Sequence, residues 1–204
     1  MRLLTRAAIA LSVTACVTVG LAPSAYAEKV VHADATADVI SWGWDDEKEA
    51  ETTVPAPEQR NGDILRTVVQ HRLRKVILTT SYAELRRLDP ASHFVSIVTN
   101  ESVRRHVEVA PTATRPQGRV LFSTGSGRTV SCTGLERRID YLANTLRLVI
   151  PRSCLSAPRW VRVGFGAVRT RETDLTPQTF VDDANLQGAV GSAHPTYGAR
   201  VRRG

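Results

Sequence analysis

Aspartates are the side chains in this sequence with the clearest potential for metal chemistry. The candidates are Asp34, Asp38, Asp45, Asp46, Asp63, Asp182 and Asp183. Carboxylate oxygens suit a hard cation such as Ca²⁺. Asp182 and Asp183 form the candidate metal pair, because adjacent acids in a loop repel each other unless something neutralises them. No EF-hand spacing is present, and the alternative is that these are solvated loop acids, with Asp63 capping a turn. Structural calcium is therefore the one cofactor that these residues suggest.

Tryptophans supply the candidate ligand-binding surface. Trp42 and Trp44 flank a single glycine just before an acidic cluster, and paired aromatics beside carboxylates can stack on a sugar and hydrogen-bond to it. Trp160 and Arg162 share the outer face of a predicted strand with two glycines, which leave room for a ligand or for another backbone. These four residues are candidates for glycan binding. The alternative is that the indoles only pin the N-terminal arm and close the end of the core.

Catalytic motifs are absent from the sequence. None of the five histidines stands in a metal-binding pair. Gly125-Ser126-Gly127 lacks the spacing of a nucleophile elbow and lies between two predicted strands, so it indicates a turn. No phosphate loop or dinucleotide fingerprint occurs. We therefore predict a protein that is not an enzyme; the alternative is a hydrolase whose Ser, His and Asp meet only in the fold.

The first 27 residues have the pattern of a secretory signal peptide. Arg2 and Arg6 precede an apolar run over 7–21, and Ala25-Tyr26-Ala27 has the small-x-small form of a cleavage site. Cys16 suggests a lipoprotein anchor as an alternative, but the apolar run continues beyond it. No other stretch is long and apolar enough to span a bilayer. The sequence thus predicts a secreted protein cleaved after Ala27, without a transmembrane span in the mature chain.

Two cysteines remain after that cleavage, and we expect them to form one disulfide. Cys132 ends one predicted strand and Cys154 follows another, so strand pairing within one hairpin would bring the sulfurs together. Secretion into an oxidising compartment favours this bond.

Hydrophobic alternation predicts an all-β chain. Residues 28–60, with an acidic cluster and two prolines, read as an N-terminal arm or edge segment, and 61–204 as the main domain. Short strands are expected from Ile64, from Lys75, at 93–99, 102–109, 118–124 and 128–133, and around Leu148 and Phe165. One helical turn is expected at 82–88. The tail from Thr173 should wrap the domain, with an edge strand near 200–202. Many short strands favour an antiparallel β-sandwich, jelly-roll-like in its organisation.

The chain is basic, with a formal net charge of +7. The arginines are spread along the strands and are not gathered in a stripe with stacking aromatics, which argues against nucleic acid as a partner. Attraction to anionic cell-wall polymers suits an exported cation better.

Several segments resemble a known group of proteins. They are 61–64, 82–85, 138–141, 150–155 (Ile-Pro-Arg-Ser-Cys-Leu), 158–164 and 182–184. Together they resemble secreted β-sandwich proteins of GC-rich bacteria that carry no assigned function. The fold pattern is also similar to carbohydrate-binding modules and DOMON-type domains, a likeness that speaks to fold and not to activity.

We therefore expect a secreted, non-catalytic β-sandwich that binds a glycan or polymer of the cell envelope. The alternative is a protein-interaction or structural module without a small ligand.

Overall fold

The computed structural model describes residues 28–45, 49–172, 177–188 and 194–204. The expected signal peptide and Asp46 lie outside the described residues. The elements are β1 (Glu28–Ala33), β2 (Ile40–Asp45), β3 (Ala50–Pro55), β4 (Ile64–His71), β5 (Lys75–Tyr82), β6 (Ser92–Thr99), β7 (Arg104–Ala110), β8 (Arg119–Thr124), β9 (Glu136–Asp140), β10 (Thr145–Pro151), the 3₁₀ helix η1 (Arg152–Leu155), β11 (Trp160–Arg171), β12 (Gln178–Asp183) and β13 (Arg200–Arg202).

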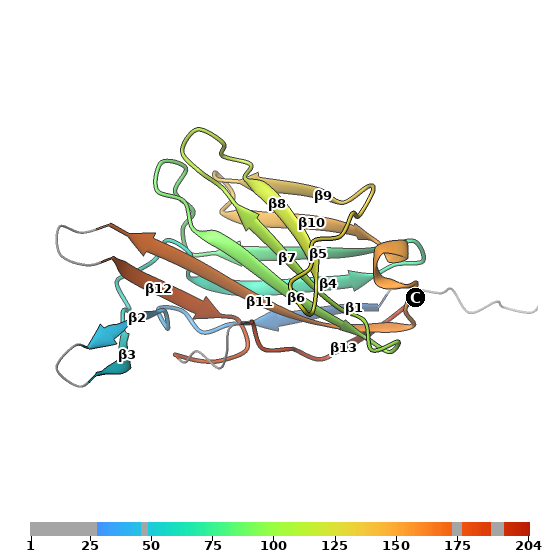
Figure 1. Ribbon diagram of the computed structural model, residues 1–204, viewed down its shortest axis with the longest axis horizontal. Helices are drawn as coiled ribbons and strands as arrows, with labels where there is room; N and C mark the ends of the chain where they lie inside the picture. The colour runs from blue at the N-terminus through green and yellow to red at the C-terminus, as the bar shows by residue number, and fades with distance from the viewer. Residues whose placement is uncertain (1–27, 46–48, 173–176, 189–193) are drawn as a thin grey trace, which may run out of the picture.

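Two antiparallel sheets pack face to face, which confirms the predicted β-sandwich. Sheet A has five strands in the order β1-β4-β5-β10-β9. Sheet B has eight, in the order β3-β2-β12-β11-β6-β7-β8, with β13 also paired to β11. In Figure 1 strands β6, β7, β8 and β11 run obliquely across the strands of sheet A.

Alternation of side chains along the strands builds the core between the sheets. In β10 the apolar Leu146, Leu148 and Ile150 are buried, whereas Arg147 is exposed. In β11 Val161, Val163 and Phe165 are buried. Side chains of successive strand residues point to opposite faces, so each strand gives one apolar row to the core. These rows meet the buried residues of β5 (Lys75–Tyr82) in one core between the sheets.

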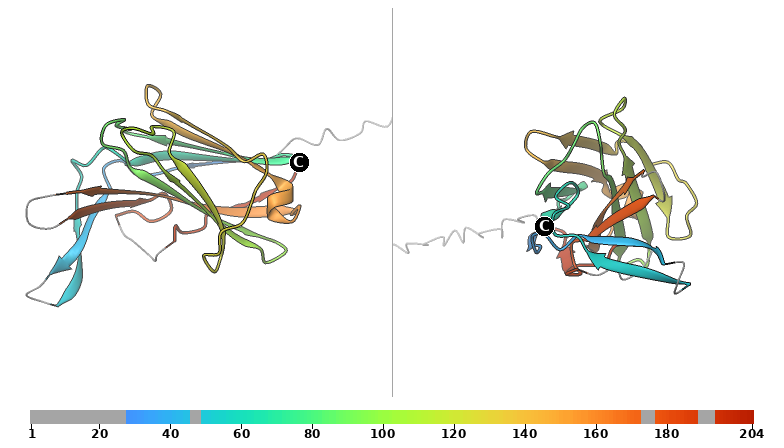
Figure 2. Two further views of the ribbon diagram at one scale, coloured as in Figure 1. Left: turned by 45° about the horizontal axis from the view of Figure 1, so that its top comes forward. Right: turned by 90° about the vertical axis from the view of Figure 1, so that its left-hand side faces the viewer.

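Residues 28–60 contribute three strands to the sandwich. Strand β1 lies at an edge of sheet A and β3 lies at an edge of sheet B, so the chain crosses between the layers at 34–39 and returns at 56–63. The β2–β3 hairpin extends beyond the rest of the sandwich, as the left view of Figure 2 shows.

Two local predictions were wrong. The stretch 128–133 forms no strand; it makes only an isolated bridge between Thr129 and Ser123, and the next strand is β9. The Gly125–Gly127 turn does form, since the Gly127 N–H donates to the Thr124 carbonyl. Beyond that bridge the chain leaves sheet B and joins sheet A. The stretch 82–88 forms no helix; the Leu85 and Arg86 N–H groups donate to the side-chain oxygens of Asn144 and Asn61.

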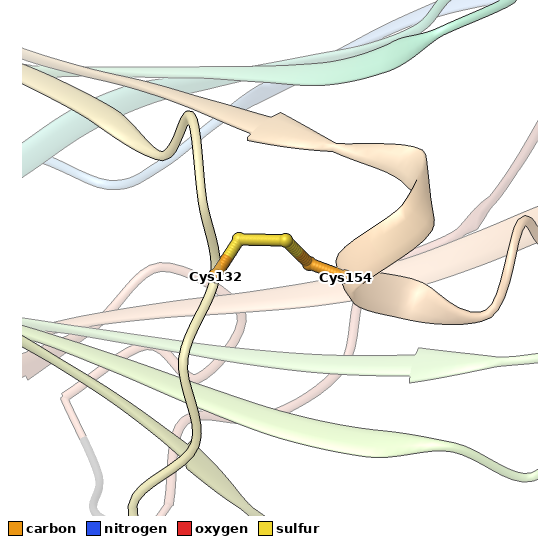
Figure 3. Close-up of a disulfide and its surroundings, with 2 residues drawn as sticks. All are labelled: Cys132 and Cys154. Atoms are coloured by element: carbon orange, nitrogen blue, oxygen red, sulfur yellow. A yellow bond between two sulfur atoms is a disulfide. The ribbon is translucent and has the colours of Figure 1, made fainter.

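The predicted disulfide between Cys132 and Cys154 is present, with Cα atoms 5.5 Å apart. Figure 3 shows that it does not join paired strands: Cys132 lies in the loop before β9 and Cys154 lies in η1. It therefore ties two irregular segments together. Closing a loop of 22 residues stabilises the fold by about 3 kcal/mol in the chain-entropy description.

Candidate functional site

The C-terminal segment, residues 194–199, crosses the outer face of sheet B, the face turned away from sheet A. A Cβ added to Gly164 would lie 2.5 Å from the carbonyl oxygens of Pro195 and Thr196, so the backbones meet where this glycine leaves room. The Gly198 N–H donates to the Val163 carbonyl at 3.0 Å. The sequence predicted that either a ligand or another backbone would lie over the glycines of this strand. At Gly164 it is a backbone.

Arg162 fastens this segment. Its Nε donates to the Gly198 carbonyl at 2.8 Å and its Nη2 donates to the Tyr197 carbonyl at 3.0 Å. Trp160 lies two residues earlier on the same strand. The Arg200 guanidinium lies over its ring, 4.7 Å from the ring centroid. Both predicted ligand residues therefore contact the protein's own C-terminal region.

A hollow of about 250 Å³ lies beside the C-terminal segment on the outer face of sheet B. Its lining includes Trp42, Phe94, Gly166, Val168, Thr179, Val181, Asp183, His194 and Pro195. The indole of Trp42 is 39% exposed, and that of Trp44, two residues further along the β2–β3 hairpin, is 61% exposed. Apolar walls with a few polar groups are typical of small-ligand sites.

The four predicted ligand residues do not form one surface. Across the sheet, Trp42 of β2 pairs with Thr179 of β12, and Thr179 pairs with Thr170 of β11. Trp42 is therefore level with the last residues of β11, whereas Trp160 is the first residue of that strand. At about 3.3 Å per strand residue, ten residues separate the two positions by about 33 Å. The structure thus brings Trp42 and Trp44 together on the hairpin and leaves Trp160 and Arg162 at the other end of the sheet.

A second hollow, of about 210 Å³, adjoins the first and shares Phe94, His194 and Pro195 with it. In it the Ser96 hydroxyl lies 3.1 Å from His106 Nδ1, and the His106 ring stacks on His194 with centroids 3.9 Å apart. Burial, followed by the nearby His194 and Arg104, lowers the pKa of His106. Ser96 and His106 are paired residues of the neighbouring strands β6 and β7. The sequence alone does not give the register of these strands and therefore did not indicate this contact.

The contact between Ser96 and His106 is of the kind that nucleophilic catalysis uses, but the serine is not accessible to a substrate. Ser96 is completely buried, and a nucleophile must reach its substrate. Among the hydrogen bonds between described residues, no carboxylate accepts from His106 to orient the ring. The arrangement therefore favours a packing role for both residues.

Four aspartates meet where the chain crosses between the sheets. Asp34 and Asp38 lie in the β1–β2 crossing, Asp63 precedes β4, and Asp182 comes from β12. One oxygen each from Asp34, Asp38 and Asp182 lie within 4.8 Å of one another. Asp182 Oδ2 accepts the Ile64 N–H at 2.5 Å, and Asp63 Oδ2 accepts the Ala37 N–H at 3.1 Å.

Burial and mutual repulsion raise the pKa values of these four carboxyl groups. Desolvation, followed by the nearby Asp38, raises the pKa of Asp34 to about 7. Desolvation, together with Asp34, Asp38 and Asp63, raises the pKa of Asp182 to about 8. The pKa values of Asp38 and Asp63 are also raised, mainly by burial. Such a cluster favours binding of a proton or of a cation.

Asp182 and Asp183, the metal pair expected from the sequence, point to opposite faces because they lie in a strand and not in a loop. Asp182 joins the cluster between the sheets. Asp183 accepts the Thr196 N–H at 2.8 Å and the Asn185 N–H at 3.0 Å. Asp183 therefore holds the C-terminal segment and does not join Asp182 in one site. The neighbours of Asp182 in the cluster, Asp34 and Asp38, come from a distant part of the chain.

Within the described ranges, no helix is long and apolar enough to cross a membrane. Comparison of the chain with protein families, curated proteins and solved structures finds no match.

Proposed function

We propose that this protein is a secreted, non-catalytic β-sandwich that binds a cell-envelope glycan or anionic polymer on the outer face of sheet B. The observation that carries the proposal is the 250 Å³ hollow with a partly exposed Trp42 at its wall. An indole face stacks on the C–H face of a sugar, and polar groups at the rim fix its orientation.

The size of the hollow favours a small ring. Sites for drug-sized ligands begin at about 300 Å³, so this hollow suits one sugar unit better than a larger ligand. The second hollow shares Phe94, His194 and Pro195 with it, and two adjacent hollows suit successive units of a polymer. The formal net charge of +7, which becomes +5 when Arg2 and Arg6 are removed with the signal peptide, favours approach to anionic chains.

Titration of the protein with soluble peptidoglycan fragments tests the proposal, with tryptophan fluorescence and retention on insoluble peptidoglycan as readouts. Trp42→Ala should weaken binding by about fivefold or more, because truncating a central interface tryptophan costs more than about 1 kcal/mol. Trp44→Ala, which alters an indole outside the lining of the hollow, should weaken it less. The melting temperature of Trp44→Ala should barely change, since this indole is 61% exposed.

Trp160→Ala is the matched control, because it removes an indole at the far end of β11. It should leave glycan binding unchanged. Wild-type protein that binds no glycan, or a Trp160→Ala variant that loses as much affinity as Trp42→Ala, would contradict the proposal.

The β2–β3 hairpin favours a second candidate, a protein-interaction module. Trp44 and Val54 are 61% and 57% exposed on this projecting hairpin, whose outer strand β3 is an edge of sheet B. Exposed apolar groups beside an unpaired edge suit strand addition by a partner. Trp44→Ala that abolishes capture of a protein partner, in a chain that binds no glycan, would favour this candidate.

A further inference from the structure

Three of the four carboxylates between the sheets have the spacing of ligands around one ion. Oxygens of Asp34, Asp38 and Asp182 lie within 4.8 Å of one another. Calcium binds oxygen at 2.3–2.6 Å, so two oxygens on the same ion are at most about 5 Å apart. The three oxygens therefore fit around a single Ca²⁺ without a change of the backbone.

Asp63 provides an independent indication that a ligand belongs here. It is only 1% exposed, and its Oδ1 has no hydrogen-bond partner among the described residues. Its Oδ2 accepts the Ala37 N–H from the segment between Asp34 and Asp38, and the next residue, Ile64, donates to Asp182, so Asp63 lies beside the cluster. Asp34 Oδ2 and Asp38 Oδ1 are likewise buried without such a partner. Buried carboxylate oxygens without a donor are costly, and a cation would satisfy all three.

The protein's own cationic side chains compensate little of the negative charge of these four aspartates. The ion pairs of the described residues do not include these four aspartates. Of the four aspartates, only Asp63 has Arg60 among the causes that shift its pKa, and there the effect of Arg60 is the smallest. Most of the negative charge therefore has no counter-charge from the described part of the chain.

We propose that Asp34, Asp38 and Asp182 bind one calcium ion beside the buried Asp63, and that this ion joins the β1–β2 crossing, the start of β4 and strand β12. An all-oxygen carboxylate set suits a hard cation, and the flexible coordination of Ca²⁺ tolerates an irregular arrangement. Mg²⁺ demands a near-ideal octahedron and keeps several waters, which a closely packed set of buried carboxylates does not favour. The ion would replace repulsion between the crossings by attraction and so tie sheet A to sheet B.

Calorimetric titration of the EGTA-treated protein with CaCl₂ tests the proposal. One Ca²⁺ should bind per chain, and at a hundredfold excess over Kd the melting temperature should rise by about 5–10 °C. MgCl₂ at the same concentration should give a much smaller rise. No heat and no thermal shift with Ca²⁺ would overturn the proposal, and an equal response to Mg²⁺ would overturn the assignment to calcium.

Asp34→Asn separates a metal ligand from a structural side chain, because the amide keeps the shape and an acceptor oxygen for the Ala35 N–H. In EGTA the variant should melt no lower than wild type, since it removes a repelling charge, and it should bind Ca²⁺ at least tenfold more weakly. Asp140→Asn, which alters a turn acceptor on β9, is the matched control and should behave as wild type. An Asp34→Asn variant that melts lower by the same amount with and without Ca²⁺ would overturn the proposal.

Discussion

Gly164 determines how closely the C-terminal segment approaches sheet B. A Cβ at this position would lie 2.5 Å from the carbonyl oxygens of Pro195 and Thr196. These are backbone atoms, which cannot move aside as the end of a flexible side chain can. The close approach lets Arg162 reach the carbonyls of Tyr197 and Gly198, so one missing side chain allows three hydrogen bonds including that of the Gly198 N–H.

We predict that Gly164→Ala destabilises the protein by about 1–3 kcal/mol, the usual cost of forcing atoms into a packed site. Gly43→Ala is the control, because an added Cβ there meets no atom within 4 Å. Chemical denaturation of both variants measures the difference. Equal stability of the two variants would show that the C-terminal segment is not held against β11.

His93 is a buried base whose protonation opposes folding. It is 2% exposed, its ring lies 5.1 Å from that of Tyr82, and burial lowers its pKa to about 4. The unfolded chain binds this proton near pH 6.5, so between pH 6.5 and 4 the unfolded state holds more protons. Its contribution to stability is therefore present above pH 6.5 and is lost as the pH falls towards 4.

The predicted loss from His93 is about 3 kcal/mol between pH 7 and pH 4. Unfolding measured across this range should show that His93→Phe, which cannot be protonated, loses less stability than wild type by about that amount. The exposed His32 serves as the control, and His32→Phe should follow the wild-type curve. Parallel curves for wild type and His93→Phe would refute the prediction.

Among the strands, alternation of apolar and polar residues was the reliable signal. It identified β4, β5, β6, β7, β8, β10 and β11, because each has one face against the core. It failed at 128–133, where the chain leaves sheet B, and it missed β1, β2, β3, β9 and β12. In β9, for example, Ile139 is the one buried residue among five. The disulfide was predicted correctly for the wrong reason, since neither cysteine lies in a strand.

We predict that Leu148→Ala in β10 lowers the free energy of unfolding by about 2–5 kcal/mol, because Leu148 is 1% exposed and its loss leaves a cavity. Arg147→Ala, one residue earlier and on the opposite, exposed face, should change it by less than about 0.5 kcal/mol. Urea denaturation of the two variants measures the contrast. Similar losses for both would mean that the register of β10 is not the one described.

Besides the hydrophobic core, several long-range contacts that sequence patterns do not reveal join the two sheets. The sequence identifies Asp34, Asp38 and Asp63 only as three of seven candidate acids, and their proximity to Asp182 depends on how the chain crosses between layers. The Ile64–Asp182 hydrogen bond spans 118 residues. Likewise, Trp42 is recognisable as an exposed aromatic, but the hollow beside it requires the C-terminal segment over β11.

Strand β13 is another such contact, because it pairs with β11 of sheet B and also packs against β1 and β4 of sheet A. Val201, at its centre, is 1% exposed and belongs to the main core. Its carbonyl lies 3.2 Å from His71 Nδ1, and the Gly204 N–H donates to the His71 carbonyl at 3.2 Å. The end of the chain therefore closes the space between the two sheets.

We predict that Val201→Ser destabilises the whole sandwich by about 2–4 kcal/mol, the sum of lost apolar burial and of a hydroxyl placed in the core. Hydrogen exchange should rise together in β13, β1 and β11, because the strand connects both layers. Arg202→Ser, at the exposed neighbouring position, is the control and should leave exchange in β1 and β11 unchanged. If exchange in Val201→Ser rises only within residues 200–204, β13 is an independent flap and the two sheets are held together without it.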